Sequence, residues 1–171
     1  MKFVLAALTS MIFISCSVSN SERNNGGSDR SATAVPEDFA IEVEHTACFG
    51  TCPIYAVRVE ATGAVHYHGE RFVEAEGARE SHVEADAVED LWLRVQEANF
   101  FDLDHSYEFD NPACGPEIAD LPSTIIRVTA EGREHEVRRN DGCEERPEGW
   151  NALRSGVDRL PEVVVWVGEQ R

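Results

Sequence analysis

The chain has 171 residues, of which 42% are hydrophobic, which is enough for one packed domain with accessory segments and too many for a wholly disordered chain. Its 32 acidic residues outnumber the 15 lysines and arginines, so the formal charge at pH 7 is −17. A field of this sign repels phosphate backbones and anionic lipid headgroups, and it argues against nucleic acid as a partner. Cationic partners and metal ions are compatible with it, and the acidic surface is expected to keep the protein soluble.

The first fifteen residues have the pattern of an export signal. Met1-Lys2 gives a positive start, and residues 3–14 form a mostly apolar, uncharged run of signal-peptide length. Ser15-Cys16 follows directly and resembles a bacterial lipobox, in which the cysteine is acylated and becomes the mature N-terminus. We therefore expect a signal peptide at 1–15 and a lipid on Cys16, with a plain secretory signal as the alternative.

Residues 16–35 are expected to form a flexible tether between the lipid and a single domain at 36–171. The segment is rich in Ser, Asn and Gly and cannot bury a core. Ser17 is not the aspartate associated with inner-membrane retention, so the resemblance implies the outer membrane, facing the periplasm, as the location.

Four further cysteines are an even number, which indicates disulfides in an exported protein: Cys48, Cys52, Cys114 and Cys143. Three connectivities exist, and we favour Cys48–Cys52 with Cys114–Cys143. Gly50 gives the small first loop the freedom it needs, and the longer second loop removes more unfolded-state entropy. A redox-active pair is the alternative, but the spacer is three residues long and Pro53 leads into a strand, so no helix is expected to lower a thiol pKa.

Alternating apolar residues predict an antiparallel sheet. Strands are expected at 39–47, 54–61 and 65–68 with a break at Gly69, then in hairpins of 72–75 with 78–83 and of 124–128 with 133–139. Residues 104–122 have no clear period and are expected to be a long loop anchored by Cys114.

Two segments show the period of a helix. Val88, Leu91, Trp92, Val95 and Ala98 lie on one face, and Asp86 with Glu89 indicates a cap. A second stripe follows Pro147, while residues 163–167 are compatible with either helix or strand. The fold class is therefore α+β, an antiparallel β-sheet of about five to seven strands with two helices packed on one face.

The segment Cys48-Phe49-Gly50-Thr51-Cys52-Pro53, followed by Tyr55, resembles the opening signature of a bacterial family, domain of unknown function 6438. Weaker matches follow in order: Gly63, Val65, Tyr67, Gly69, Leu91, Phe100-Phe101-x-Leu103, Tyr107, Asp120, Pro122 and Thr124. The resemblance covers about residues 39–160. It implies an exported or lipid-anchored domain with no established activity, so it transfers no catalytic residue. Cys114 and Cys143 are additions to the family pattern, and two additions that arrive together fit a mutual bridge.

The sequence offers weak metal candidates and no recognisable catalytic set. His66 and His68 share one side of a strand, with His45 or His82 as neighbours, but an exposed strand face explains them without a metal. The acidic stretch 102–120 lacks the spacing of a calcium loop, and no G-x-S-x-G, phosphate-loop or H-E-x-x-H motif occurs. The candidate binding residues are Phe49, Gly50, Thr51, Pro53, Tyr55, Tyr107 and Asp120.

The leading hypothesis is a lipid-anchored cell-envelope protein that binds or scaffolds without catalysis or a cofactor, with an envelope protein as its partner. The second is a periplasmic enzyme, either thiol-redox at Cys48 and Cys52 or metal-assisted at the histidines. The third is an inhibitor-like protein whose exposed Cys48–Cys52 loop inserts into a partner.

Overall fold

The computed structural model of the protein describes residues 34–109, 111–116 and 118–168. The expected signal peptide, Cys16 and all but the last two residues of the expected tether lie outside the described residues. No helix in the described part of the chain is long and apolar enough to cross a membrane.

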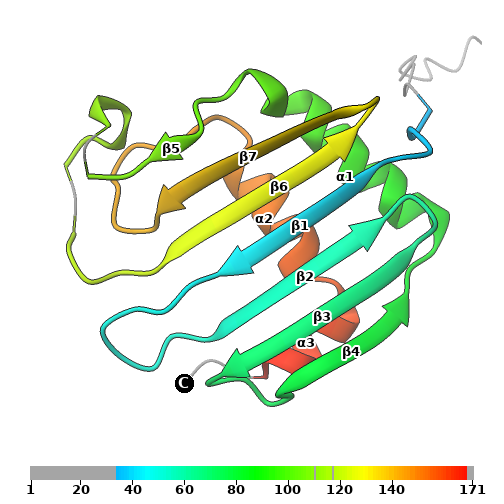
Figure 1. Ribbon diagram of the computed structural model, residues 1–171, viewed down its shortest axis with the longest axis horizontal. Coiled ribbons are helices and arrows are strands. Elements are labelled where there is room, and N and C mark those ends of the chain that lie inside the picture. Colours follow the sequence, from blue (N-terminus) through cyan, green and yellow to red (C-terminus); the bar gives the residue numbers. More distant parts are fainter. Residues whose placement is uncertain (1–33, 110, 117, 169–171) are drawn as a thin grey trace, which may run out of the picture. The chain divides into compact units, whose positions relative to one another are not determined.

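A seven-stranded sheet runs through the domain in the order β4-β3-β2-β1-β6-β7-β5 (Figure 1). Its strands are β1 (Ala40–His45), β2 (Ile54–Glu60), β3 (Ala64–Arg71), β4 (Gly77–His82), β5 (Ser106–Tyr107), β6 (Ser123–Ala130) and β7 (Arg133–Asn140). Every neighbouring pair is antiparallel except β5 and β7, which are parallel. The expected antiparallel sheet is confirmed, with one short parallel strand in the segment that was expected to be loop.

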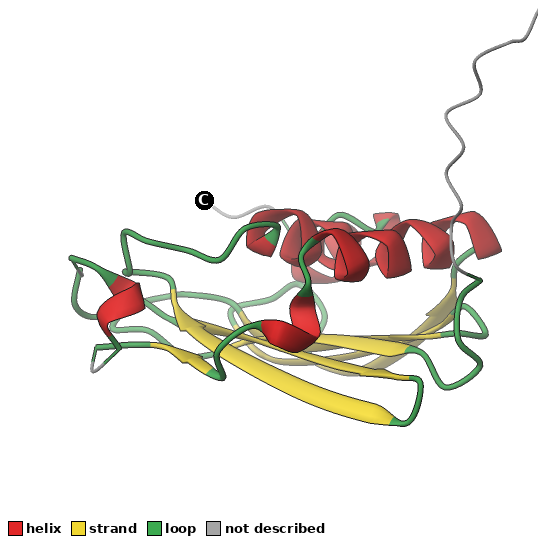
Figure 2. Cartoon of the chain, turned by 90° about the horizontal axis from the view of Figure 1, so that it is seen from above, coloured by secondary structure: helices red, strands yellow, loops and turns green. Residues whose placement is uncertain are grey.

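Three helices of the described residues cover one face of the sheet, and no helix of residues 34–168 as described covers the other, which we call the bare face (Figure 2). They are α1 (Ala85–Glu97), α2 (Trp150–Asp158) and α3 (Pro161–Val167), and two 3₁₀ turns, η1 (Phe100–Asp102) and η2 (Pro112–Cys114), lie in the connections. The α+β class is confirmed, with three helices instead of two. The extra helix begins where Pro161, which lacks a backbone N–H, follows Leu160 in an extended conformation, and this breaks the chain into α2 and α3.

Three local expectations were wrong. Strand β3 continues through Gly69 to Arg71, and the expected strand at 72–75 is a bend between β3 and β4. A Cβ at Gly69 would lie 2.2 Å from the carbonyl oxygen of Ala75, so the glycine allows a close approach and does not end the strand. The N-cap of α1 is Glu84, and the expected cap, Asp86, lies inside the first turn.

The core lies between the sheet and the helices. Side chains two apart on a strand share a face, and the helix-facing ones of the central strands are apolar and buried: Ile41, Val43, Val57, Val59, Val65, Ile126, Val128 and Val137. They pack with Leu91, Trp92, Val95, Leu153 and Val157 of the helices. The bare face carries charge, and Arg127 there pairs with Glu42, Glu44 and Glu136.

Candidate functional site

At one end of the sheet, each of four neighbouring strands carries a polar residue on the face that the helices cover. The apolar pattern of β1 closes with His45, that of β2 begins with Tyr55, and that of β6 begins with Thr124. His45 is paired in register with both Tyr55 and Thr124, and Thr124 is paired with Arg139 of β7. We call these four residues the polar row. It bounds the core at the end of the sheet where the β1–β2 loop lies.

Helix α2 supplies the acceptor for the first half of the polar row. Oδ1 of Asp158 lies 2.9 Å from Nε2 of His45 and accepts a hydrogen bond of 3.0 Å from the Tyr55 hydroxyl. The two rings stack with centroids 4.5 Å apart. Burial raises the pKa of Tyr55, and the nearby charge of Asp158 raises it further, so the phenol stays protonated and donates.

Asp141 holds the second half of the polar row. It accepts from the Thr124 hydroxyl at 3.2 Å and from Nη1 of Arg139 at 3.3 Å, and Nη1 of Arg154 lies 3.4 Å away. The Arg139 side chain is only 3% exposed. Burial lowers the pKa of Arg139, Asp141 opposes that shift, and the charges of Arg146 and Arg154 add to the lowering.

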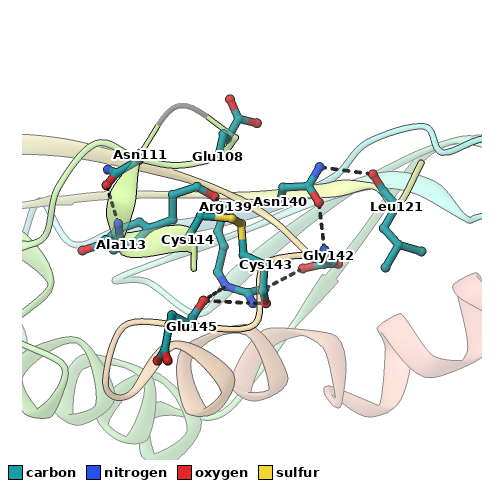
Figure 3. Close-up of a disulfide and its surroundings, with 12 residues drawn as sticks. Glu108, Asn111, Ala113, Cys114, Leu121, Arg139, Asn140, Gly142, Cys143 and Glu145 are labelled. Carbon is teal, nitrogen blue, oxygen red and sulfur yellow. Dashed lines mark hydrogen bonds and ion pairs between the residues drawn. A yellow bond between two sulfur atoms is a disulfide. The ribbon is translucent and has the colours of Figure 1, made fainter. Parts of the chain in front are cut away.

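The guanidinium of Arg139 also donates to the backbone carbonyls of Cys143 and Glu145 (Figure 3). This segment is fixed by the Cys114–Cys143 disulfide, whose Cα atoms are 4.8 Å apart. Backbone hydrogen bonds reinforce it, since the N–H of Glu145 donates to the carbonyl of Cys114 at 3.1 Å. The disulfide therefore positions the carbonyls that hold a buried cation.

The polar row opens to solvent through two hollows that share Asp141 and Arg154. The first, of about 390 Å³, is lined by His45, Cys52, Pro53, Tyr55 and Asp158 among others. The second, of about 510 Å³, is lined mainly by arginines. Together they form the groove, as we call it below.

The loop between β1 and β2 rises beside the first hollow. Cys48 and Cys52 are bonded, with Cα atoms 5.8 Å apart, and the Phe49 side chain between them is 91% exposed. The N–H of Phe49 donates to the carbonyl of Asp120 at 3.2 Å, and the N–H of Thr46 donates to the carbonyl of Ser123 at 3.0 Å. The loop is thus held by a covalent bond and by two backbone hydrogen bonds to the segment that leads into β6.

The structure separates the candidate residues of the sequence into groups. Phe49, Gly50 and Thr51 are exposed at the loop tip, while Pro53 and Tyr55 line the groove. Asp120 contributes its carbonyl to the loop. Tyr107 is buried, and its hydroxyl accepts from the N–H of Asp104, which is a structural role.

The histidines that were candidates for a metal are not brought together. His66 and His68 lie on the bare face, where His66 Nδ1 is 3.7 Å from Glu80 Oε1. His45 lies on the opposite face, and His82 bonds to the carbonyl of Thr62. Among residues 34–109, 111–116 and 118–168, no group of three His, Cys, Asp or Glu side chains is arranged to hold a metal ion.

Sequence reasoning missed most of the groove. Asp141, Arg154 and Asp158 were not candidates, and His45 was considered only as a metal neighbour. One signal was available, because the alternation of β1, β2 and β6 ends in a polar residue on the core side of each strand. The partners of these residues come from distant positions that only the topology brings together.

The groove is chemically suited to holding a polar ligand. His45 is oriented by Asp158, as a proton-transfer group is in many enzymes. Within the described residues, however, no serine, threonine or thiol makes a hydrogen bond to His45. The donors of the polar row are instead bonded to Asp158 and Asp141, which keeps them in fixed positions.

The fold and the groove define a small α+β domain crosslinked by two disulfides, with a polar groove at one end of its sheet. The model of the family called domain of unknown function 6438 matches residues 39–161, and the chain belongs to this family. The match includes all seven strands, α1 and α2, and therefore every residue of the polar row. No curated protein matches the chain.

Proposed function

We propose that the protein is a lipid-anchored, non-catalytic module of the bacterial cell envelope that binds a protein partner through the Cys48–Cys52 loop. The observation that carries the proposal is Phe49, an aromatic residue that is 91% exposed on a loop held by a disulfide and by backbone hydrogen bonds. A large apolar side chain in water is unfavourable, and because the backbone of this loop is already held, burial of the ring by a partner costs little backbone entropy. Aromatic residues of this kind dominate the binding energy of many interfaces.

The surroundings of Phe49 indicate the chemistry of the partner. Leu121 follows the residue that holds the loop and is 40% exposed, and Ile118 nearby in the chain is also exposed. The chain as a whole carries a charge of −17. The matching partner has an apolar pocket for the Phe49 ring and a basic rim that complements the acidic surface.

The envelope location is supported by two independent features. The first sixteen residues have the order of a lipoprotein signal, with a positive start, an apolar run and Cys16. The domain carries two disulfides, and such bonds persist in oxidising compartments such as the periplasm. An intact mass of the membrane-extracted protein tests the anchor directly, because acylation of Cys16 adds the mass of the lipid. In a second test, we expect Cys16→Ala to abolish membrane association.

The binding proposal is tested by placing a photo-crosslinking amino acid at position 49 of the full chain in its native envelope. Phe109 is the matched control, because it is also an exposed phenylalanine but lies outside the disulfide loop. We expect one discrete crosslinked product at position 49 and none at 109. We also expect Phe49→Ala to weaken binding of the partner in that product at least tenfold and Phe109→Ala to leave its binding unchanged.

Equal crosslinking at both positions, or full capture by Phe49→Ala, would show that the loop is not the binding surface. Because Phe49 is exposed, its replacement by Ala should change the free energy of unfolding by less than about 0.5 kcal/mol. A loss of capture with unchanged stability therefore reports on the interface and not on the fold.

A thiol-redox function is the second candidate, and one observation favours it. Cys52 and His45 line the same hollow, so a Cys52 thiolate formed on reduction would have an imidazole close by. If Cys48–Cys52 is reduced by glutathione at a potential where Cys114–Cys143 stays oxidised, and this preference disappears in His45→Ala, the redox function is favoured over the binding module.

A further inference from the structure

Four arginines gather around the second hollow of the groove, on a chain whose formal charge is −17. They are Arg139, Arg146, Arg154 and Arg159, and they come from β7, from the segment that follows it and from α2 with its C-terminal end. Like charges placed together repel each other, so such a cluster costs folding free energy unless an anion compensates it. We propose that this hollow, called the arginine pocket below, binds the phosphate group of a phosphate monoester.

The charge balance of the arginine pocket indicates a dianion. Asp141 pairs with Arg139 and Arg154, and Asp158 pairs with Arg154. Counting the lining residues together with Asp158, two carboxylates stand against four guanidinium groups, an excess of two positive charges among these six groups. A phosphate monoester carries about −1.5 to −2 at neutral pH, so it matches this excess, whereas a single carboxylate or a phosphodiester supplies only −1.

Two of the arginines are fixed in place before any ligand arrives. Arg139 is almost fully buried and is held by Asp141 and by the carbonyls of Cys143 and Glu145 (Figure 3). Arg154 is held by Asp141 and Asp158. Charged groups that are already ordered lose little entropy on binding, and both of these arginines line the arginine pocket.

The other two arginines have their charge available. Arg146 and Arg159 are exposed, and neither forms an ion pair with any acidic side chain in the described part of the chain. The repulsion within the cluster is visible at Arg139, because Arg146 and Arg154 both act to lower its pKa. An arginine presents several N–H donors in a planar fork that matches two phosphate oxygens.

The remaining lining of the arginine pocket is polar and the space is adequate. Asn151 and Ser155 of α2 contribute an amide and a hydroxyl, and the hollow measures about 510 Å³. This volume exceeds that of a bare phosphate, so the pocket holds the phosphate together with part of the group esterified to it. The charge of −17 does not prevent binding, because at physiological ionic strength charges beyond about 8 Å are largely screened.

The test is isothermal titration of the full chain in detergent with glycerol phosphate, against Arg146→Gln/Arg159→Gln. Both side chains are exposed, so the double variant is expected to fold as the parent does, and a thermal melt verifies this. Arg79→Gln is the matched control, because Arg79 is exposed on β4, at the far edge of the sheet, and within the described residues its side chain bonds only to the carbonyl of Ala78. We expect the affinity for glycerol phosphate to fall at least tenfold in the double variant and less than twofold in Arg79→Gln.

Three further ligands define the chemistry. Dimethyl phosphate and acetate, both monoanions, are expected to bind at least tenfold more weakly than glycerol phosphate. A water-soluble short-chain phosphatidic acid presents the same phosphate monoester on a lipid. Equal affinity for it and for glycerol phosphate assigns the site to the phosphate group itself, and a tenfold preference for it assigns a lipid headgroup.

The proposal is overturned if the folded protein binds neither phosphate monoester, if the double variant binds as tightly as the parent, or if acetate matches glycerol phosphate. It does not depend on the Phe49 interface. Phe49→Ala is expected to leave the phosphate affinity unchanged, so failure of one proposal leaves the other standing.

Discussion

Nε2 of His45 lies 2.9 Å from Oδ1 of Asp158, and the contact joins the last residue of β1 to the last residue of α2 across 113 positions of the chain. The same carboxylate oxygen accepts the hydroxyl of Tyr55, at the start of β2. One side chain of α2 therefore connects the helix layer to two central strands at the mouth of the groove.

Asp158→Ala is expected to lower the free energy of unfolding by about 2 kcal/mol, because it leaves the largely buried Tyr55 hydroxyl without its acceptor. Asp158 also pairs with Arg154, four residues earlier on α2. The matched control is therefore Asp90→Ala, which removes the exposed Asp90–Arg94 pair of α1, with the same four-residue spacing, and should cost about 0.3–0.5 kcal/mol. Urea denaturation measures both. In a double-mutant cycle, Tyr55→Phe should cost less in the Asp158→Ala background than in the parent, and equal costs would disprove the coupling.

The two disulfides should differ in their contribution to stability. Cys48–Cys52 spans four positions and Cys114–Cys143 spans 29. In the loop-entropy model their removal costs about 2 and about 3.6 kcal/mol respectively. We expect the Cys114→Ser/Cys143→Ser variant to unfold at a lower urea concentration than Cys48→Ser/Cys52→Ser, and the reverse order would show that loop closure does not govern either bond.

The fold was largely predictable because its strands have a clear period of two. Ile41 and Val43 alternate with Glu42 and Glu44, and such a pattern has one buried face in any sheet. The cysteine pairing could be favoured on loop length, and the exposed loop was a candidate because the cysteines flank it. These features are local, and local patterns are what a single sequence displays.

The main errors concern contacts that the apolar period of the sequence does not display. The pattern predicts a strand break at Gly69, because it does not show that the carbonyl oxygen of Ala75, six residues on, would lie 2.2 Å from a Cβ there. Residues 163–167 read equally well as helix or strand, and their state follows from Pro161 and from contacts such as that of Trp166 with Tyr67. The groove was missed for the same reason, since Asp158 is 113 positions from His45.

Gly149 is expected to be far less tolerant of substitution than a glycine with a similar backbone. It precedes α2 at φ 76°, and a Cβ there would lie 2.6 Å from Cβ of Ala98, at the end of α1. Gly132, in the β6–β7 turn, has φ 70° and nothing within 4 Å of its Cβ position. Gly132→Ala should therefore cost only the backbone strain, about 1–2 kcal/mol.

Gly149→Ala adds a clash between two helices to the same strain and should destabilise the domain by clearly more. Thermal unfolding of the two variants side by side gives the comparison. Similar melting temperatures would mean that α1 and α2 separate easily and that their packing contributes little to the stability of the domain.

Asp38 is expected to give the domain an acid-sensitive contribution to stability. Its carboxylate accepts from the N–H groups of Glu131 at 2.8 Å and Gly132 at 2.7 Å, and so fastens the segment before β1 to the β6–β7 turn. These two hydrogen bonds hold the pKa of Asp38 below its ordinary value, against a smaller opposing effect of burial. The unfolded chain binds the proton more readily, so the stabilisation is present above about pH 3.9 and is lost as the pH falls through the lower folded-state pKa.

The measurement is the melting temperature of the parent and of Asp38→Asn between pH 7 and pH 2.5. The parent should melt higher at every pH above about 4, and the difference should shrink as the pH falls further, because protonation removes the same charge that the substitution removes. Glu37→Gln is the control, since it removes an adjacent carboxylate that makes no hydrogen bond within the described residues. A difference between parent and Asp38→Asn that stays constant down to pH 2.5 would show that the charge of Asp38 does not stabilise the turn.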